Sequence, residues 1–228
     1  MVTDHFYGGN TAIDRNLSWP KWVDAFCRGY EDTRDEGARR GLDVFFGWEE
    51  TFDGDDYLVY GLDKEWLLQH PEVRVWTRKE QFDTVRHYGG CVVQAHPFRQ
   101  YNYINCIHLS GCVDAVEAAN RGNQPSFDAL AWVYAKKINV PVTAGSDVHR
   151  VEDVENDTVF GVYLDKKMET VADYVNAVLN NAVAGLKIPP GRFDLHGDEK
   201  LILPADIRDK EDRSTGKDIG EFLGLLGL

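Results

Sequence analysis

Residue types that bind divalent metals recur where predicted strands end. His5, Glu49 and His96 each lie at the end of a predicted strand, and Asp147 and His149 together follow another. In parallel α/β folds the carboxyl ends of the strands open onto one face, so we expect these five side chains to converge. Carboxylates gathered at one place repel each other, and divalent cations remove that cost. The pattern therefore predicts a metal site with histidine and carboxylate ligands.

The convergence carries more weight than any single residue. A histidine before proline, such as His96, is most often structural, and a glutamate at a strand end, such as Glu49, is usually solvated. The pair Asp147-x-His149 is more specific, because alternate positions of an extended segment place both side chains on one side. Both residue types also suit zinc and similar ions.

Strand-type and helix-type patterns alternate along the chain. The predicted strands are residues 2–5, 43–49, 57–62, 91–96, 113–118, 140–145 and 158–164. The predicted helices are residues 19–40, 80–88, 126–138 and 168–184. Ser18, a capping box at Thr77-Arg78-Lys79-Glu80, and Pro125 mark helix starts, while Gly41 and Gly185 mark helix ends. This alternation predicts a parallel sheet or a barrel.

The chain is acidic and has the composition of a globular protein. It has 228 residues, of which 43% are hydrophobic and 28% charged, with a formal net charge of −13. Affinity for nucleic acid is built largely from Lys and Arg contacts to phosphates, so extended nucleic acid is not an expected partner. A small phosphorylated substrate remains compatible with this charge, because bound divalent metals supply local positive charge.

The sequence carries no signal for a membrane or for secretion. No apolar run approaches the roughly 18 residues of a membrane span. The first residues lack the basic and apolar regions of a secretion signal. We therefore expect a cytoplasmic protein that makes no contact with a membrane.

The four cysteines form no Cys-x-x-Cys pair, and we expect reduced, mostly buried thiols. A zinc site that uses Cys106 and Cys112 is the alternative. It is less favoured because the five residues between them fit no common ligand spacing.

The remaining histidines act as a comparison set. His70 and His87 lie in or beside helical patterns and His196 lies in the tail, so we expect all three to be surface or packing residues. His108 is expected in a loop between Pro97 and Val113, as a secondary candidate for a site.

Five segments carry the candidate ligands. They are Thr3-Asp4-His5, Gly47-Trp48-Glu49, Ala95-His96-Pro97-Phe98-Arg99, Val116-Glu117-Ala118-Ala119-Asn120 and Gly145-Ser146-Asp147-Val148-His149. In order and rough spacing they resemble the PHP (polymerase and histidinol phosphatase) family of metal-dependent phosphoesterases. The Gly-Ser-Asp-x-His and Ala-His-Pro-x-Arg motifs together are the specific part of this resemblance.

The resemblance implies a distorted (β/α)7 TIM-like barrel that holds two or three divalent ions, usually zinc, manganese or iron. By analogy with the family, Glu49 would bridge two metals, His96 would bind one of them, and Asp147 would bind another. His5 and His149 would share a third.

The resemblance also implies substrate contacts from Arg99 and Asn120. Arginine is a natural clamp for phosphate, although an arginine beside carboxylates is often only a structural ion pair. The implied chemistry is in-line attack on phosphorus by a metal-activated water, without a covalent protein intermediate. The sequence has no Gly-x-Ser-x-Gly elbow, Walker loop or dinucleotide fingerprint that would favour another mechanism.

The chain departs from the family at two places. The family normally begins with a strand that carries His-x-His, followed by a helix, and no such segment precedes Thr3-Asp4-His5 here. We therefore expect a barrel without its first βα unit, and fewer than three metals per chain. Many family members also have a histidine shortly after the bridging glutamate. Asp56 could replace that ligand here, whereas Tyr57 at that place would indicate a two-metal or altered site.

Three explanations fit the missing start, and they stay open. Met1 could be an internal methionine of a truncated or wrongly assigned product, which we favour. Another chain could complete the site, or the protein could be a reduced member of the family. A gap in a barrel exposes strand edges, which favours a homo-oligomer.

The expected organisation is a hydrolase domain over residues 1–188 and a C-terminal extension over residues 189–228, packed on the domain or partly exposed. The charged stretch 206–218 is expected to be exposed. The expected function is metal-dependent hydrolysis of a small phosphorylated metabolite or nucleotide. Two alternatives remain: a metal-binding or interaction module with weak or no catalysis, and a metal-dependent hydrolase of a C–N bond.

Overall fold

The computed structural model describes residues 1–99, 104–154, 159–194 and 204–224. His196 and residues 225–228 of the apolar end lie outside this part. The chain divides into two compact units. The N-terminal unit comprises residues 1–92 and 168–176, and the C-terminal unit comprises residues 93–167 and 177–228.

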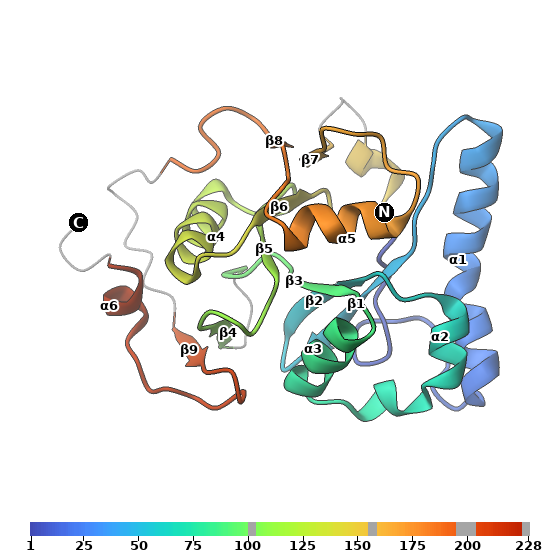
Figure 1. Cartoon of the computed structure of the whole chain (residues 1–228), viewed down its shortest axis with the longest axis horizontal. Coiled ribbons are helices and arrows are strands. Elements are labelled where there is room, and N and C mark those ends of the chain that lie inside the picture. Colours follow the sequence, from blue (N-terminus) through green and yellow to red (C-terminus); the bar gives the residue numbers. More distant parts are fainter. Residues whose placement is uncertain (100–103, 155–158, 195–203, 225–228) are drawn as a thin grey trace. The chain divides into compact units, whose positions relative to one another are not determined.

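The described chain contains both helices and short strands, and several of the strands follow one another directly (Figure 1). The helices are α1 (Trp19–Arg39), α2 (Lys64–Gln69), α3 (Arg78–His87), α4 (Pro125–Ile138), α5 (Val171–Leu179) and α6 (Ile219–Leu223), with two 3-10 helices, η1 (Pro71–Val75) and η2 (Val151–Val154). The strands are β1 (Gly47–Phe52), β2 (Asp55–Tyr60), β3 (Cys91–Gln94), β4 (Asn105–His108), β5 (Ala115–Asn120), β6 (Val142–Gly145), β7 (Gly161–Tyr163), β8 (Gly185–Lys187) and β9 (Ala205–Arg208).

The expected distorted (β/α)7 barrel is wrong, because the described strands form open sheets and no closed barrel. Five strands make a mixed sheet in the order β1-β2-β3-β5-β6, and two further sheets have two strands each, β4-β9 and β7-β8. A barrel that lacks its first βα unit therefore does not describe this chain.

The first hairpin explains the error. β1 and β2 are antiparallel, with Thr51 opposite Asp56. Asp53 and Gly54 connect them with φ angles of +56° and +99°, which are typical of a tight hairpin turn. A parallel crossover needs a connection of about a dozen residues or more, and only two residues are available here. The sequence interpretation had treated both runs as strands of successive βα units.

The start of the chain lies along β1. Val2 and His5 make isolated parallel bridges to Phe46 and Glu49, in place of the continuous strand expected over residues 2–5. The Val2 amide donates to the Phe45 carbonyl at 2.9 Å. This pairing fixes His5 beside Glu49, which matters for the site described below.

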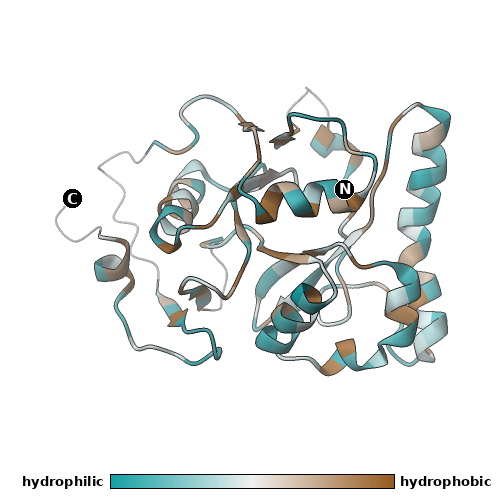
Figure 2. Ribbon diagram, viewed as in Figure 1, coloured by the Kyte–Doolittle hydropathy of each residue, from teal (hydrophilic) through white to brown (hydrophobic). Residues whose placement is uncertain are grey.

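The first half of α1 supplies the aromatic core of the N-terminal unit. Trp19, Trp22 and Phe26 recur at helical spacing and are buried. The Phe6 ring packs edge-on against Trp22 and Phe26, with ring centroids 5.1 and 5.0 Å apart. Trp19 and Trp22 are therefore packing residues, and their rings stack on each other with centroids 5.5 Å apart. The second half of α1 is strongly hydrophilic (Figure 2).

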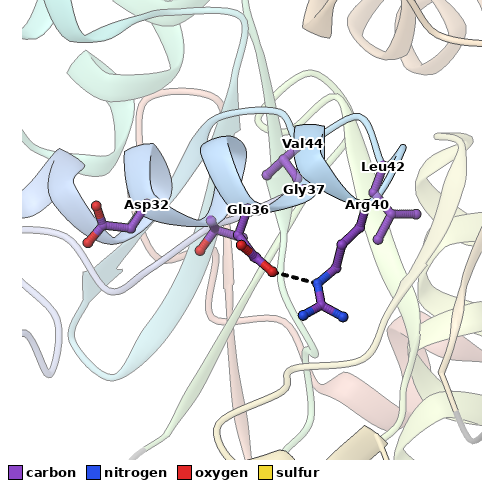
Figure 3. A pocket seen from close by; sticks show the side chains of 7 residues that line it. Asp32, Glu36, Gly37, Arg40, Leu42 and Val44 are labelled. Carbon is purple, nitrogen blue, oxygen red and sulfur yellow. Dashed lines mark hydrogen bonds and ion pairs between the residues drawn. The ribbon is translucent and has the colours of Figure 1, made fainter.

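A surface pocket of about 410 Å³ lies where α1 ends and the chain turns back (Figure 3). Gly37 permits this turn, because a Cβ atom there would lie 2.6 Å from Val44 Cγ2. The Arg40 Nε donates to Glu36 Oε1 at 2.6 Å across the rim. The full lining is Asp32, Thr33, Glu36, Gly37, Arg40, Leu42 and Val44. None of the residues that the sequence nominated for a site lines this pocket.

The expected helix starts are largely confirmed. Thr77 and Glu80 form the capping box at the start of α3, with Glu80 accepting from the Thr77 amide at 2.8 Å. Pro125 occupies the first turn of α4, as expected. Ser18 precedes α1 but its side chain makes no capping hydrogen bond. The local signal for the start of this helix is therefore Pro20, in the first turn.

The C-terminal unit contains the parallel part of the sheet. β3 pairs with β5, and β5 pairs with β6, both in parallel. Every residue of β5 is buried, and α4 packs against this strand. The register places Asn120 beside Gly145, so the ends of β5 and β6 meet at one edge. This edge carries several of the predicted site residues.

The charged stretch after residue 205 is not simply exposed, which corrects the expectation for residues 206–218. Within it, β9 pairs in parallel with β4, and Ile207 is only 1% exposed. α6 follows, with the Asp218 side chain accepting from the Glu221 amide at 2.9 Å. In β9 the apolar residues Ala205 and Ile207 alternate with the charged residues Asp206 and Arg208. Two apolar positions are too few to indicate a strand within a charged stretch.

No helix in the described ranges is long and apolar enough to cross a membrane. The four cysteines, all of which lie in described segments, form no disulfide bond. Three of them are buried, as expected.

Candidate metal and substrate site

His5 and Glu49 are brought together by the pairing of the N-terminal segment with β1. The two residues form a parallel bridge, and His5 Nδ1 lies 3.1 Å from Glu49 Oε1. The Glu49 side chain is 8% exposed and that of His5 26% exposed. The pair is therefore sheltered from water on the glutamate side and open on the histidine side.

Asp56 joins this pair from the neighbouring strand. Asp56 lies opposite Thr51, and Thr51 and Glu49 are two residues apart on β1, so all three side chains share one face of the hairpin. Thr51 Oγ1 donates to Asp56 Oδ1 at 2.5 Å and orients the carboxylate. One ligand atom from each of His5, Glu49 and Asp56 lies within 4.8 Å of the other two.

This His5–Glu49–Asp56 group fits a divalent ion. Two ligands at about 2.1 Å from one ion lie at most about 4.2 Å apart, so a small inward movement of the side chains suffices. Gly9 keeps space beside the group, because a Cβ atom there would lie 3.1 Å from His5 Nδ1 and 2.9 Å from Thr51 Oγ1. One imidazole and two carboxylates form a donor set that suits zinc, manganese or iron.

Glu50 positions the loop that follows His5. The Gly8 amide donates to Glu50 Oε1 at 2.6 Å, and the Thr51 amide donates to the same oxygen at 3.0 Å. Burial of Glu50 raises its pKa to about 7, although these two amides act in the opposite direction. Arg15 holds the other end of this loop, since its Nη2 donates a hydrogen bond to the Gly9 carbonyl at 2.6 Å.

In the C-terminal unit, His96 lies at the end of β3 against a buried carboxyl. Its amide donates to Glu117 Oε2 at 3.1 Å, and the Asn120 Nδ2 donates to the same oxygen at 3.0 Å. His96 has a φ of +27°, an unusual backbone conformation for a residue with a side chain. Glu117 therefore helps to hold the turn that presents His96.

Glu117 is buried, and this has a chemical consequence. Burial raises the pKa of Glu117 to about 7, against the hydrogen bond from Asn120. Gly145 makes room for the carboxyl, because any Cβ at that position would collide with Glu117 Oε1. Glu117 lies within one of the five motifs, but the sequence alone assigns it no role. A single acidic residue inside a strand of small apolar residues was the signal that could have identified it.

Arg99 lies at the centre of a polar network in the same unit. Its Nη2 donates to Asp147 Oδ2 at 2.6 Å and to Asn120 Oδ1 at 2.9 Å, and its Nε donates to Asn123 Oδ1 at 2.9 Å. Gly122 lies against this network, since a Cβ atom there would lie 3.2 Å from Asn120 Oδ1 and 3.4 Å from Arg99 Nη2. The two residues nominated for substrate contact, Arg99 and Asn120, are thus in direct contact with each other.

Asp147 and His149 lie just beyond β6. Burial of Asp147 acts to raise its pKa, but the charges of His96 and Arg99 and the Arg99 hydrogen bond outweigh it, so the pKa is lowered. His149 Nδ1 lies 3.4 Å from Asp147 Oδ1, and the His149 side chain is 58% exposed. Asp147 therefore remains a carboxylate at neutral pH, with Arg99 on one oxygen.

The seven nominated residues thus fall into two sets. His5 and Glu49 belong to the N-terminal unit, where Asp56 completes a group of three ligands. The other nominated residues belong to the C-terminal unit: His96, Arg99, Asn120, Asp147 and His149. Tyr57, the neighbour of Asp56, is buried and contributes to packing.

Among the described residues, the structure adds a second group of three potential ligands. Cys106, His108 and Asp212 each offer one ligand atom within 4.8 Å of the others. His108 lies in β4, which corrects the expectation of a loop. His70 behaves as a packing residue, as expected, because its ring stacks on Trp66 with centroids 4.0 Å apart.

Comparison with known proteins assigns this chain to no family. No protein-family model matches the chain, and no curated protein matches it. The similarity to the PHP family therefore rests on the five motifs alone.

Proposed function

We propose that this protein is a metal-dependent phosphoesterase that hydrolyses a small phosphorylated metabolite or nucleotide. The observation that carries the proposal is the His5–Glu49–Asp56 group, in which three ligands from three neighbouring backbone segments lie within 4.8 Å of one another. Divalent ions held by such ligands lower the pKa of coordinated water and offset charge on phosphoryl oxygens.

The residues of this group have distinct tasks in the proposal. Glu49, the most buried of the three, supplies a carboxylate whose position is set by β1. Thr51 orients the Asp56 carboxylate, and the parallel bridge to β1 orients His5. The ligands are thus held by backbone pairing rather than by flexible loops, which favours a preformed site.

Arg99 supports phosphate as the preferred substrate class. Guanidinium groups bind phosphate through parallel N–H donors and carry a charge at every physiological pH. The Arg99 side chain is fixed by Asn120, Asn123 and Asp147, so its position is defined before substrate arrives. In a chain with a net charge of −13, an anionic substrate would share this guanidinium with the Asp147 carboxylate.

One observation favours a second candidate function, a metal-binding module without catalysis. Asp147 Oδ2 is engaged by Arg99 at 2.6 Å, and such a pair is equally suited to holding the segment after β6 in place. In that case the His5–Glu49–Asp56 group would bind metal, and the C-terminal unit would contribute no hydrolytic chemistry.

We also propose a cytoplasmic location with reduced thiols. Its support is the cysteine pattern, which contains no Cys-x-x-Cys pair.

Three assays on the full chain separate these functions. Calorimetric titration with Mn²⁺ or Zn²⁺ measures metal binding, p-nitrophenyl phosphate reports phosphoester hydrolysis, and an anilide of a simple carboxylic acid reports C–N hydrolysis. We expect metal binding together with phosphoester hydrolysis. Metal binding without any hydrolysis would establish the second candidate, and anilide hydrolysis alone would contradict phosphate as the substrate class.

A further inference from the structure

We propose that Cys106, His108 and Asp212 form a second metal site, separate from the proposed catalytic ligands, which binds a zinc-type ion and fastens the C-terminal segment to β4. All three residues belong to the C-terminal unit. One ligand atom from each lies within 4.8 Å of the others, and Cys106 Sγ lies 3.9 Å from His108 Nε2.

The distance between the first two ligands is close to that in a zinc site. Bonds of about 2.3 Å to sulfur and about 2.0 Å to nitrogen place the two atoms roughly 3.5 Å apart in a tetrahedral site. A thiolate, an imidazole and a carboxylate are all established zinc ligands, and a thiolate selects against calcium and magnesium. Three protein ligands leave one position for water.

β4 holds its two ligands on one face. Cys106 and His108 occupy alternate positions, so their side chains point the same way. Both are almost fully buried, with 4% and 2% exposed surface. The geometry is therefore set by a strand rather than by a loop.

Buried hydrogen bonds fix the backbone of β4 at both ligands. Gln94 Nε2 donates to the Cys106 carbonyl at 2.6 Å, and the His108 amide donates to Tyr134 Oη at 2.7 Å. Tyr134 Oη in turn donates to Gln94 Oε1 at 3.0 Å. This closed network joins β3, β4 and α4, and it prepares two of the three ligand positions.

The third ligand comes from a turn about one hundred residues later in the chain. β9 pairs with β4 in register, with Cys106 opposite Asp206 and His108 opposite Arg208, and Figure 1 shows the two strands side by side. The turn after β9 then brings Asp212 back, with its carbonyl accepting from Arg208 Nη1 at 2.8 Å. Arg208 Nη1 also lies 3.8 Å from Asp212 Oδ1, so a bound ion would share this carboxylate with the arginine.

The small sheet explains why a metal would be useful here. An isolated two-stranded sheet is marginally stable in water, and β4 and β9 are each only four residues long. An ion that links β4 to the turn after β9 closes a long loop and stabilises the folded state by the free energy of binding. We therefore assign this group a structural role.

The test is a titration of the full reduced chain with Co²⁺, which reports thiolate ligation by charge-transfer absorption in the near ultraviolet. We expect this band in the wild-type chain, its loss in Cys106→Ser, and at least about a tenfold weaker affinity in Asp212→Asn. Cys112→Ser is the matched control and should retain the band. Because only a cysteine ligand gives this signal, ions bound by His5, Glu49 and Asp56 do not interfere.

A second readout covers the case in which Cys106→Ser fails to fold. Zn²⁺ should slow amide hydrogen exchange in residues 205–208 of the wild-type chain, and Asp212→Asn should remove that protection. Absence of a thiolate band and of zinc protection in the wild-type chain would overturn the proposal. So would a band that Cys112→Ser abolishes and Cys106→Ser leaves intact.

Discussion

Glu117 shows how much one buried side chain can determine. Its carboxyl accepts from the His96 amide and from Asn120, and it lies beside the backbone of Gly145. Because it is buried, its proton is held to a pKa of about 7 instead of the ordinary value of 4.5. The charge of the carboxyl that accepts from the His96 amide therefore changes near neutral pH.

The substitution Glu117→Gln should change how stability depends on pH. Between pH 4.5 and about 7 the unfolded chain has released a proton that the folded chain still holds at Glu117, so the free energy of unfolding falls as pH rises through this range. The total fall is about 3 kcal/mol. Glutamine keeps an oxygen for both hydrogen bonds and lacks the titration.

Urea unfolding at pH 5 and pH 8 checks this prediction. The difference in unfolding free energy between Glu117→Gln and the wild type should shift by about 3 kcal/mol in favour of the variant at pH 8. Glu50, whose pKa is raised in the same direction, is present in both proteins and cancels. An identical pH dependence in both proteins would contradict the assignment.

At the scale of elements, the Asp53-Gly54 turn determines the difference between an open sheet and a barrel. Gly54 has a φ of +99°, which residues with a Cβ atom rarely adopt. Gly54→Ala should therefore destabilise the chain by about 1–2 kcal/mol. Gly161→Ala is the matched control, since no atom lies within 4 Å of its added Cβ, and it should change stability little. Equal effects of the two substitutions in urea unfolding would argue against the hairpin.

Arg192 links the segment after β8 to β5 and α4. Its Nε donates to the buried Asp128 Oδ2 at 2.7 Å, and its Nη2 donates to the carbonyls of Asn120 and Asn123 at 2.9 and 2.6 Å. Burial acts to raise the pKa of Asp128, and the Arg192 hydrogen bond opposes this shift.

Arg192→Met should cost about 3–5 kcal/mol of unfolding free energy, because it removes the cation that pairs with the buried Asp128 carboxylate and one donor from each of two carbonyls. Adding Asp128→Asn should recover part of the loss by removing the buried charge. Arg34→Met is a suitable control, since Arg34 pairs with the exposed Asp35 and lies over the Tyr30 ring at the surface of α1. A loss below about 1 kcal/mol in Arg192→Met would show that this contact does not hold the segment in place.

The sequence predicted elements well where the signal is local. The capping box at Thr77 and the proline at the start of α4 act within one helical turn, and both were identified. The Asp53-Gly54 turn was equally local, but the alternation of strands and helices outweighed it. β4 and β9 were missed because each is short and its partner lies about one hundred residues away.

In the candidate site, too, some contacts depend on strand pairing that the sequence did not predict. The pairing of the chain start with β1 brings His5 to Glu49, as the convergence argument expects. The closeness of Asp56 depends on the antiparallel register of the hairpin, which the sequence interpretation did not contain. Asp212 could not have been associated with Cys106 and His108 without the β4–β9 pairing.

For the molecule as a whole, part of the excess of acidic residues lies in the candidate metal site. The chain carries 38 acidic against 25 basic residues. Glu49 and Asp56 share one face of the first hairpin, where a divalent ion would reverse the sign of the charge. In the proposed function, such an ion would let this acidic chain accept a small phosphorylated molecule.

The most direct test of this account is the rate of Mn²⁺-dependent phosphate release from a generic phosphoester by wild type, Glu49→Gln and Glu36→Gln. Glu36 is an exposed glutamate of α1 that pairs with Arg40, outside the proposed ligand group. The account predicts a rate that depends on added metal, a loss of at least about a hundredfold in Glu49→Gln, and no change in Glu36→Gln. A wild-type rate that is independent of metal, or full activity in Glu49→Gln, would contradict it.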